Sequence, residues 1–185
     1  MRSFFFLFLL SLTISFAACG GSEDEMPPAN EVVGTWEAIF FEAETETSTD
    51  FNGMMTNTTA QITSSNLNYE ATFNATTFTT MGDYDLTTTT TVPPNPPFVS
   101  MSSLTDIEGS GSYSIDGNQM TISGSFFAIE INGSPVDTGG EEQVVTYEIN
   151  ADGELVFTQD QEFVTTQPGV TTTSVIRSTS IWRRI

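Results

Sequence analysis

The sequence predicts an all-β protein, an antiparallel up-and-down meander that closes into a barrel of about eight to ten strands. From residue 32 onward the apolar residues follow no sustained helical period. Segments rich in Thr, Val, Ile, Phe and Tyr instead alternate with turn dipeptides at short intervals. These dipeptides are Asn-Gly and Asp-Gly, which tolerate the positive φ angles of tight hairpins. One β domain over residues 32–185 is therefore expected.

Short connections between the turn signals divide this domain into strands. We expect strands at residues 33–47, 54–63, 67–80, 84–92, 107–115, 119–131, 143–150, 154–166 and 171–184. The turn dipeptides are Asn52-Gly53, Asp116-Gly117, Asn132-Gly133 and Asp152-Gly153. The stretch "VPPNPPF" at residues 92–98 is too rich in proline for a central strand, so we expect an exposed connection there.

Apolar and polar side chains alternate along the hairpins. In "SYSIDGNQMTIS", Tyr113 and Ile115 alternate with serine before the turn, and Ile122 follows in the same pattern after it. "TYEINADGELVFT" repeats the arrangement. Each hairpin thus has a single apolar face, which a common core must cover. The side chains expected to face the interior, and to contact any ligand there, are Phe40, Tyr113, Ile122, Phe126, Tyr147 and Phe157.

The N-terminal segment has the pattern of an export signal. Arg2 precedes the apolar run "FFFLFLLSLTISF", which is shorter than the roughly 20 residues of a membrane span. The following "FAAC" resembles the bacterial lipobox, with Phe16 in place of the commoner leucine. This resemblance implies a lipoprotein signal peptide at residues 1–18 and a lipid on Cys19. Lipidation of this kind anchors a protein stably to a membrane.

Residues 19–31 are expected to be the lipidated cysteine and a flexible, acidic tether, because glycine, serine, proline and acids leave little to bury. Glu23, Asp24 and Glu25 resemble the short acidic export signal of some Bacteroidetes lipoproteins. The resemblance implies an outer-membrane protein displayed on the cell surface, with a periplasm-facing anchor as the alternative.

The two ends of the β domain carry a further resemblance. Gly34 and Trp36 form a Gly-x-Trp motif at the start of the first strand. This motif resembles the opening of lipocalins and of lipocalin-like bacterial lipoproteins. In those families an arginine from near the end of the chain packs on the tryptophan and closes the barrel. Here Arg177, Arg183 and Arg184 are available, and Arg183 is the expected partner.

The composition excludes several classes of function. The chain has 24 acidic residues, four arginines, no lysine and no histidine, with a net charge of −20. Such a protein repels nucleic-acid phosphates. A single cysteine and no histidine leave no intramolecular disulfide, no usual zinc site and no Ser-His or Cys-His pair. We expect no metal site and no cofactor.

Three functions remain for such a chain. The first is a non-enzymatic barrel that binds a small apolar ligand in its mouth. The second is an acidic accessory or interaction protein without a small ligand, such as an inhibitor of a cationic enzyme. The third is a two-carboxylate glycosidase, which we set below the other two because neighbouring acids are common in such an acidic chain. A non-enzymatic binding protein is therefore the expected function.

The lipid anchor makes a direct prediction. The full chain should fractionate with membranes and carry the mass of a diacylglyceryl group, because Cys19 provides the only thiol for attachment. Cys19→Ser should release the protein from the membrane fraction and abolish the added mass. Fractionation followed by intact-mass measurement checks this. Membrane retention of the serine variant, without lipid mass on either chain, would show that the anchor is absent.

Overall fold

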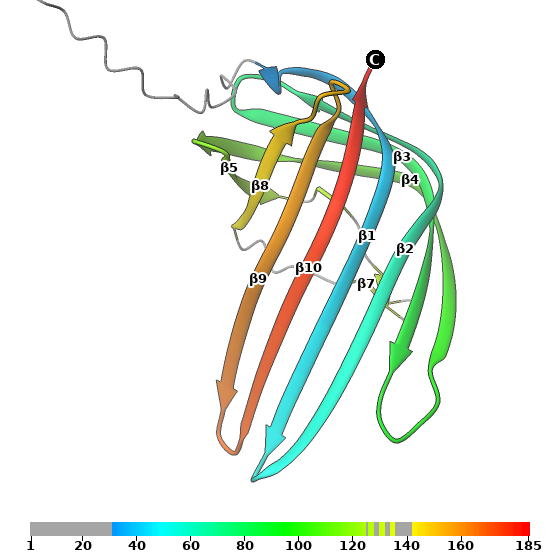
Figure 1. The fold of residues 1–185 in the computed structure, drawn as a ribbon, viewed down its shortest axis with the longest axis vertical. Coiled ribbons are helices and arrows are strands. Elements are labelled where there is room, and N and C mark those ends of the chain that lie inside the picture. The colour runs from blue at the N-terminus through cyan, green and yellow to red at the C-terminus, as the bar shows by residue number, and fades with distance from the viewer. Residues whose placement is uncertain (1–30, 125, 128–129, 132–133, 136–141) are drawn as a thin grey trace, which may run out of the picture.

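The computed structural model describes residues 31–124, 126–127, 130–131, 134–135 and 142–185. Over these residues the protein is an antiparallel meander of eight strands that closes into a barrel, in the order β1-β10-β9-β8-β5-β4-β3-β2 (Figure 1). The predicted fold class is confirmed. The signal peptide, Cys19, most of the tether and the Asn132-Gly133 turn lie outside the described residues.

The barrel strands differ greatly in length. They are β1 (Gly34–Phe51), β2 (Met54–Phe73), β3 (Thr77–Thr91), β4 (Phe98–Asp116), β5 (Gln119–Gly124), β8 (Gln143–Ile149), β9 (Leu155–Gln167) and β10 (Val170–Arg184). A separate pair is formed by β6 (Glu130–Ile131) and β7 (Ser134–Pro135). The expected turns at Asn52-Gly53 and Asp152-Gly153 are present, and both glycines have positive φ.

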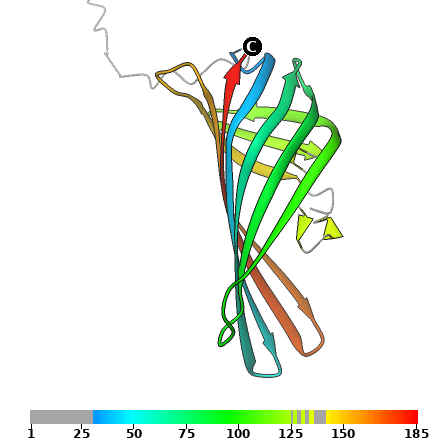
Figure 2. The same ribbon diagram turned by 90° about the vertical axis from the view of Figure 1, so that its right-hand side faces the viewer.

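Because β5 and β8 are short, the barrel is closed at only one end, and the longer strands continue beyond that end as an open sheet. On β9 the pairing with β8 stops at Thr158, and on β4 the pairing with β5 begins only at Gly111. The long strands continue beyond these points in the order β9-β10-β1-β2-β3-β4, and we call this part the extension. Figures 1 and 2 show its hairpins projecting from one end of the barrel, while the C-terminus lies at the other.

Two expected strand breaks are β-bulges within continuous strands. The gap expected between residues 63 and 67 lies inside β2, where Asn66 has a φ of 51° and the register with β3 shifts. The gap expected between residues 80 and 84 lies inside β3 at Gly82, with a φ of 131°. A Cβ at Gly82 would lie 2.0 Å from the Asn68 carbonyl oxygen, so the close approach of the strands requires glycine here.

The core fills the barrel end with aromatic side chains. Trp36, Tyr69, Phe73, Phe78 and Trp182 are almost completely buried. The rings of Phe73, Phe78 and Trp182 pack against Phe126, whose ring centroid lies 5.2 Å from that of Trp182 and 5.3 Å from that of Phe78. Phe126 comes from the segment after β5 rather than from a barrel strand. The connecting chain therefore contributes directly to the core.

The expected inward position of Phe40 is wrong. Trp36 and Ala38 face the interior, but a register shift between Ala38 and Phe40 changes the alternation, so that Phe41 points inward and Phe40 is 39% exposed. A bulge inserts one residue and moves every later side chain to the opposite face. The other five expected interior residues are buried.

This difference in burial predicts the stability of two phenylalanine variants. Phe126→Ala should lower the free energy of unfolding by about 3 to 5 kcal/mol, because it removes a buried ring from an aromatic cluster. The matched change Phe40→Ala should cost less than about 1 kcal/mol, because that ring lies on the surface. Urea denaturation followed by tryptophan fluorescence measures both. Equal losses would contradict the assignment of the two rings to core and surface.

Candidate functional site

The closed end of the barrel joins the two ends of the described chain. Trp36 on β1 is the register partner of Arg184 on β10, and the Arg184 guanidinium lies 4.7 Å from the Trp36 ring centroid. The Trp36 indole nitrogen donates a hydrogen bond to the Val32 carbonyl oxygen at 2.8 Å. Arg184 also donates to the carbonyl oxygens of Glu31 and Val33. The arginine therefore holds the incoming chain over the tryptophan.

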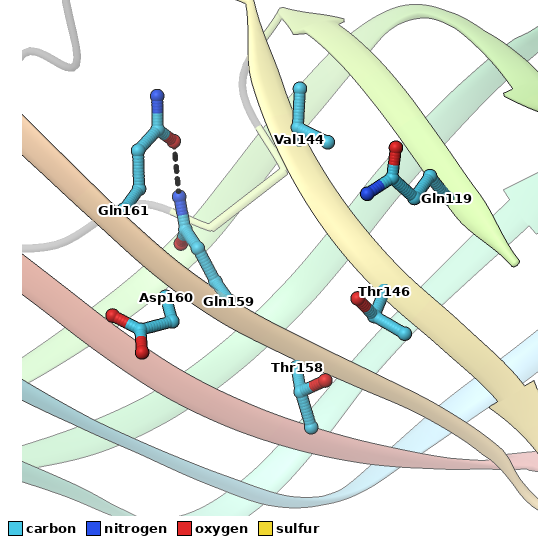
Figure 3. Close-up of a pocket in the computed structure, with 7 residues that line it drawn as sticks. All are labelled: Gln119, Val144, Thr146, Thr158, Gln159, Asp160 and Gln161. Carbon is cyan, nitrogen blue, oxygen red and sulfur yellow. Dashed lines mark hydrogen bonds between the residues drawn. The ribbon is translucent and has the colours of Figure 1, made fainter.

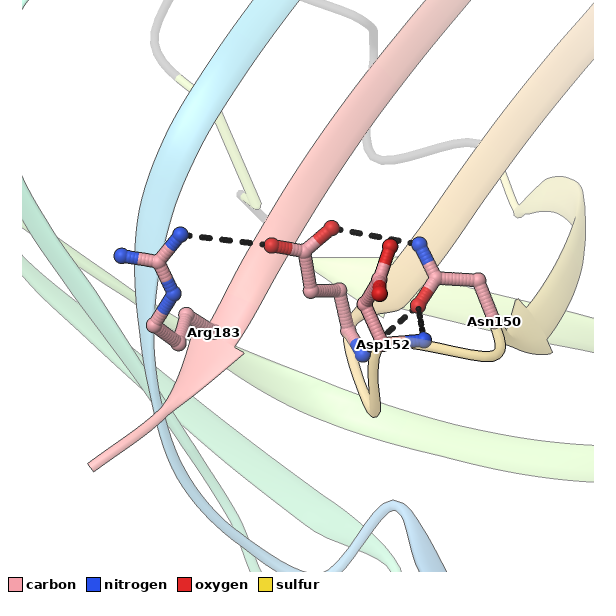
Figure 4. A network of polar contacts seen from close by, with 4 residues as sticks. Asn150, Asp152 and Arg183 are labelled. Carbon is pink, nitrogen blue, oxygen red and sulfur yellow. Dashed lines mark hydrogen bonds and ion pairs between the residues drawn. The ribbon is translucent and has the colours of Figure 1, made fainter.

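The arginine on the tryptophan is Arg184, and the expectation of Arg183 is wrong. Successive residues on a strand face opposite sides, so only Arg184 shares the face of Trp36. Arg183 points outward and approaches Glu154 at 3.3 Å. Figure 4 shows that this carboxylate also accepts a hydrogen bond from the Asn150 side chain, which orders the turn around Asp152. Arg183 thus stabilises a turn on the outer surface.

The five buried residues expected to contact a ligand belong to a packed interior. Rings of Tyr113, Phe126 and Phe157 all approach Phe73, with centroids 5.4 to 6.1 Å apart. Ile122 and Tyr147 are in the same buried cluster. Phe127, beside Phe126, stacks on Phe41 at 4.3 Å. The described side chains thus occupy the part of the barrel in which an apolar ligand was expected.

A buried hydroxyl network holds the inserted segment. The Tyr69 hydroxyl lies 2.9 Å from the Phe126 carbonyl oxygen and 2.7 Å from the Thr80 hydroxyl. Burial raises the pKa of Tyr69 above that of an ordinary tyrosine. The neutral phenol therefore contributes stability below about pH 10, which is lost as the pH rises and the phenol ionises.

A surface pocket lies where β8 and β9 separate. Its volume is about 300 Å³, and Figure 3 shows the side chains of three strands converging on it. The residues that line it are Gln119 on β5, Val144 and Thr146 on β8, and Thr158, Gln159, Asp160 and Gln161 on β9. We call this pocket the notch. It exists because β9 continues after its pairing with β8 has ended at Thr158.

Amides and hydroxyls dominate the chemistry of the notch. Gln119, Thr146 and Thr158 are register partners across three adjacent strands. The Gln159 side chain donates to the Gln161 side chain at 3.1 Å (Figure 3). Among the described residues that line the notch, Asp160 is the only carboxylate, and it lies 3.7 Å from Arg177. The notch is therefore rich in hydrogen-bond donors and acceptors but nearly neutral.

Sequence reasoning did not single out the glutamines of the notch. Residues 154–166 were expected to form a strand, and β9 confirms it. One face of that strand changes from Leu155 and Phe157 to Gln159 and Gln161. A change from apolar to amide residues on one face is the signal that marks the site. This change marks a pocket only because β8 separates from β9 after Thr158 and stays paired with β5, which the sequence of β9 does not contain.

Comparisons with known proteins found no match to the chain among family models, curated proteins or solved structures. Within the described part of the chain, no helix has the length and apolarity that crossing a membrane requires. The same residues contain no group of three or more carboxylates, histidines or cysteines placed to hold a metal ion.

The contacts at the closed end predict that Arg184→Ala and Arg183→Ala destabilise the protein to different extents. Arg184→Ala should destabilise the fold by about 1 to 2 kcal/mol, because it removes both the contact with Trp36 and the hydrogen bonds to the incoming chain. Arg183→Ala should cost about 0 to 1 kcal/mol, since it removes one exposed ion pair. Thermal and urea unfolding measure both variants. A larger loss for Arg183→Ala would contradict the closure by Arg184.

Proposed function

We propose that this chain is a lipid-anchored, non-enzymatic lipoprotein of the outer membrane, displayed on the cell surface, that acts as an accessory protein through the far end of its extension. The observation that carries the proposal is the position of the exposed apolar residues. Seven of them gather on the extension, namely Phe51, Met54, Met55, Phe98, Val99, Met101 and Val164. Exposed apolar residues that gather in one region indicate a contact surface.

The apolar tips lie at the opposite end of the barrel from the point where the expected lipid anchor would attach. The described chain begins at Glu31, which Arg184 holds at the closed end of the barrel. The hairpin tips lie at the opposite end (Figures 1 and 2). The 18 residues of β1 span about 60 Å. A lipid on Cys19 would therefore attach the closed end to the membrane and direct the apolar tips away from it, toward a partner.

The outer surface of the extension favours a cationic partner. Glu44 and Asp160 flank Arg177 in the strand register, and Arg177 makes its shortest ion pair with Glu46 at 2.9 Å. Three acids thus surround a single base, within a chain of net charge −20. Complementary charge speeds and orients association. A protein with an apolar patch bordered by basic residues fits this surface, as in the inhibition of a cationic enzyme.

The distribution of carboxylates supports a non-enzymatic role. Hydrolysis of a glycosidic bond requires two carboxylates about 5 to 10 Å apart on either side of the bond. The notch contains a single one, Asp160, and its charge is partly compensated by Arg177. This site therefore has the composition of a binding surface.

Binding of a small apolar ligand inside the barrel is the second candidate. One observation favours it: Phe126 and Phe127 enter the core from a connecting segment, so a ligand that displaces them would leave the barrel strands intact. The four other buried residues expected to contact a ligand, Tyr113, Ile122, Tyr147 and Phe157, belong to the same core cluster. Phe126→Ala should then increase the binding of an apolar fluorescent probe to the full chain, while Phe40→Ala should not.

The proposed contact surface can be tested with methionine variants. Met54 and Met55 are 70% and 64% exposed at the β1–β2 tip, and Met81 is 56% exposed on the barrel body. The double change Met54→Ser/Met55→Ser should remove proteins that copurify with the cross-linked full chain, whereas Met81→Ser should retain them. Quantitative mass spectrometry of the captured proteins measures the difference.

Salt provides the control for this experiment. Capture that depends on the acidic surface should weaken as the ionic strength rises. If the tip variant and the Met81 variant capture the same proteins in equal amounts, the extension is not the contact surface. Release from membranes by Cys19→Ser tests the anchor separately, so the two parts of the proposal can fail independently.

A further inference from the structure

We propose that the notch between β8 and β9 binds a neutral carbohydrate, with Gln159 and Gln161 as the principal hydrogen-bonding residues. The inference concerns a site distinct from the apolar tips and does not depend on the lipid anchor. It rests on the composition of the notch, on the absence of charge from the adjoining face, and on the fixed positions of the two glutamines.

The lining offers the functional groups that sugar hydroxyls require. Each amide supplies both donors and an acceptor, and each threonine hydroxyl supplies one donor and two acceptor positions. Three amides and two hydroxyls line the notch, with Val144 as an apolar contact. A volume of about 300 Å³ lies at the lower end of the range of ligand pockets. It therefore suits one end of an oligosaccharide.

The inner face of the extension continues this chemistry beyond the notch. Gln161 begins one cross-strand row that passes through Ile176 and Thr45. The strand register places the other described inner-face residues of the extension in parallel rows, and none of them is charged. Those that are at least partly exposed include Thr47, Thr49, Thr165, Thr172 and Ser174, whereas Ala43, Ala60, Ile62, Leu86, Thr88 and Leu104 are buried.

The opposite face of the same strands carries the charges. Glu44, Glu46, Asp160 and Arg177 all lie there, each next to at least one hydroxyl or amide residue on the inner face. A face that only meets solvent gains solubility from charge. The separation of charged from hydroxyl residues therefore indicates that a neutral polar partner contacts the inner face.

The glutamines are positioned before any ligand binds. Gln159 donates to Gln161 at 3.1 Å, and the Ser178 hydroxyl donates to Gln159 at 3.4 Å. Because these hydrogen bonds already restrict the side chains, a ligand that binds them costs less conformational entropy. Phe163 follows Gln161 on the same face and is partly exposed, so its ring offers an apolar surface to the C–H groups of a sugar.

Electrostatics disfavours anions and metal ions at this site. An anion would meet Asp160 and the strongly negative chain, which carries −20 overall. A metal cation would find one carboxylate, already within 3.7 Å of Arg177, where calcium sites use several oxygen ligands from carboxylates and carbonyls. A neutral polyhydroxylated ligand is the class that the lining satisfies without leaving a charge unpaired.

The test uses the full chain in detergent and an array of neutral hexose and pentose oligosaccharides, followed by titration of the strongest binder. The double variant Gln159→Ala/Gln161→Ala should weaken binding by at least about tenfold, the effect of losing two or more hydrogen bonds. Gln61→Ala is the matched control, because Gln61 lies on the outer face of β2. Its affinity should equal that of the unmodified chain.

Three further results decide the proposal. Affinity for the neutral oligosaccharide should change by less than about twofold between low and high salt, because no charge pairing is involved. Absence of binding to every neutral member of the array would overturn the proposal. Equal weakening by the Gln61 variant, or preferential binding of an anionic trigalacturonate probe, would overturn it as well. Thermal unfolding of the double variant confirms that the fold is retained.

Discussion

The pairing of the first strand with the last is the constraint on which the structure depends. β1 and β10 are joined from the Trp36–Arg184 pair to the Phe51–Val170 pair, so nearly all of both strands takes part. This closure removes two sheet edges at the barrel and places Arg184 on Trp36. It also brings the β1–β2 and β9–β10 hairpins side by side, so the same pairing that closes the core extends the sheet beyond it.

The unequal strand lengths then produce two different environments from one sheet. Where β5 and β8 take part, the wall closes and its inner face buries aromatic rings, to which Phe126 adds from a connecting segment. Where they end, the remaining strands form an open sheet whose inner face is covered with hydroxyl and amide groups. The notch lies at the boundary, because β9 continues past Thr158 without β8. The candidate binding site is thus a consequence of the topology.

The charged residues of the extension are also divided unequally between the two faces of the sheet, and they lie on the outer face. A charged group on the inner face of the barrel would require desolvation without a partner, which is costly, and aromatic residues occupy these positions instead. The same cost applies to the buried part of the extension, such as Ile62 and Leu86, and beyond it the exposed part of the described inner face is uncharged as well. Acidic residues remain on the outside, where Arg177 compensates only part of their charge. The acidic outer face and the uncharged inner face thus differ in chemistry, and the apolar tips carry residues of both faces, such as Met55 on the outer face and Met54 on the inner face.

The sequence by itself determined the all-β class, several hairpin turns and five of the six interior residues predicted from it, because side-chain alternation and turn chemistry are local properties. It did not determine the face of Phe40, the choice of Arg184 over Arg183, or the continuity of β2 and β3. Each of these depends on a bulge or a register that only the neighbouring strand fixes. The glutamine pair at residues 159 and 161 is visible in the sequence, but it became a candidate site only in the tertiary structure. The physical reason is that the pocket forms where two paired strands, β8 and β9, separate, and the sequence of one strand does not contain its pairing.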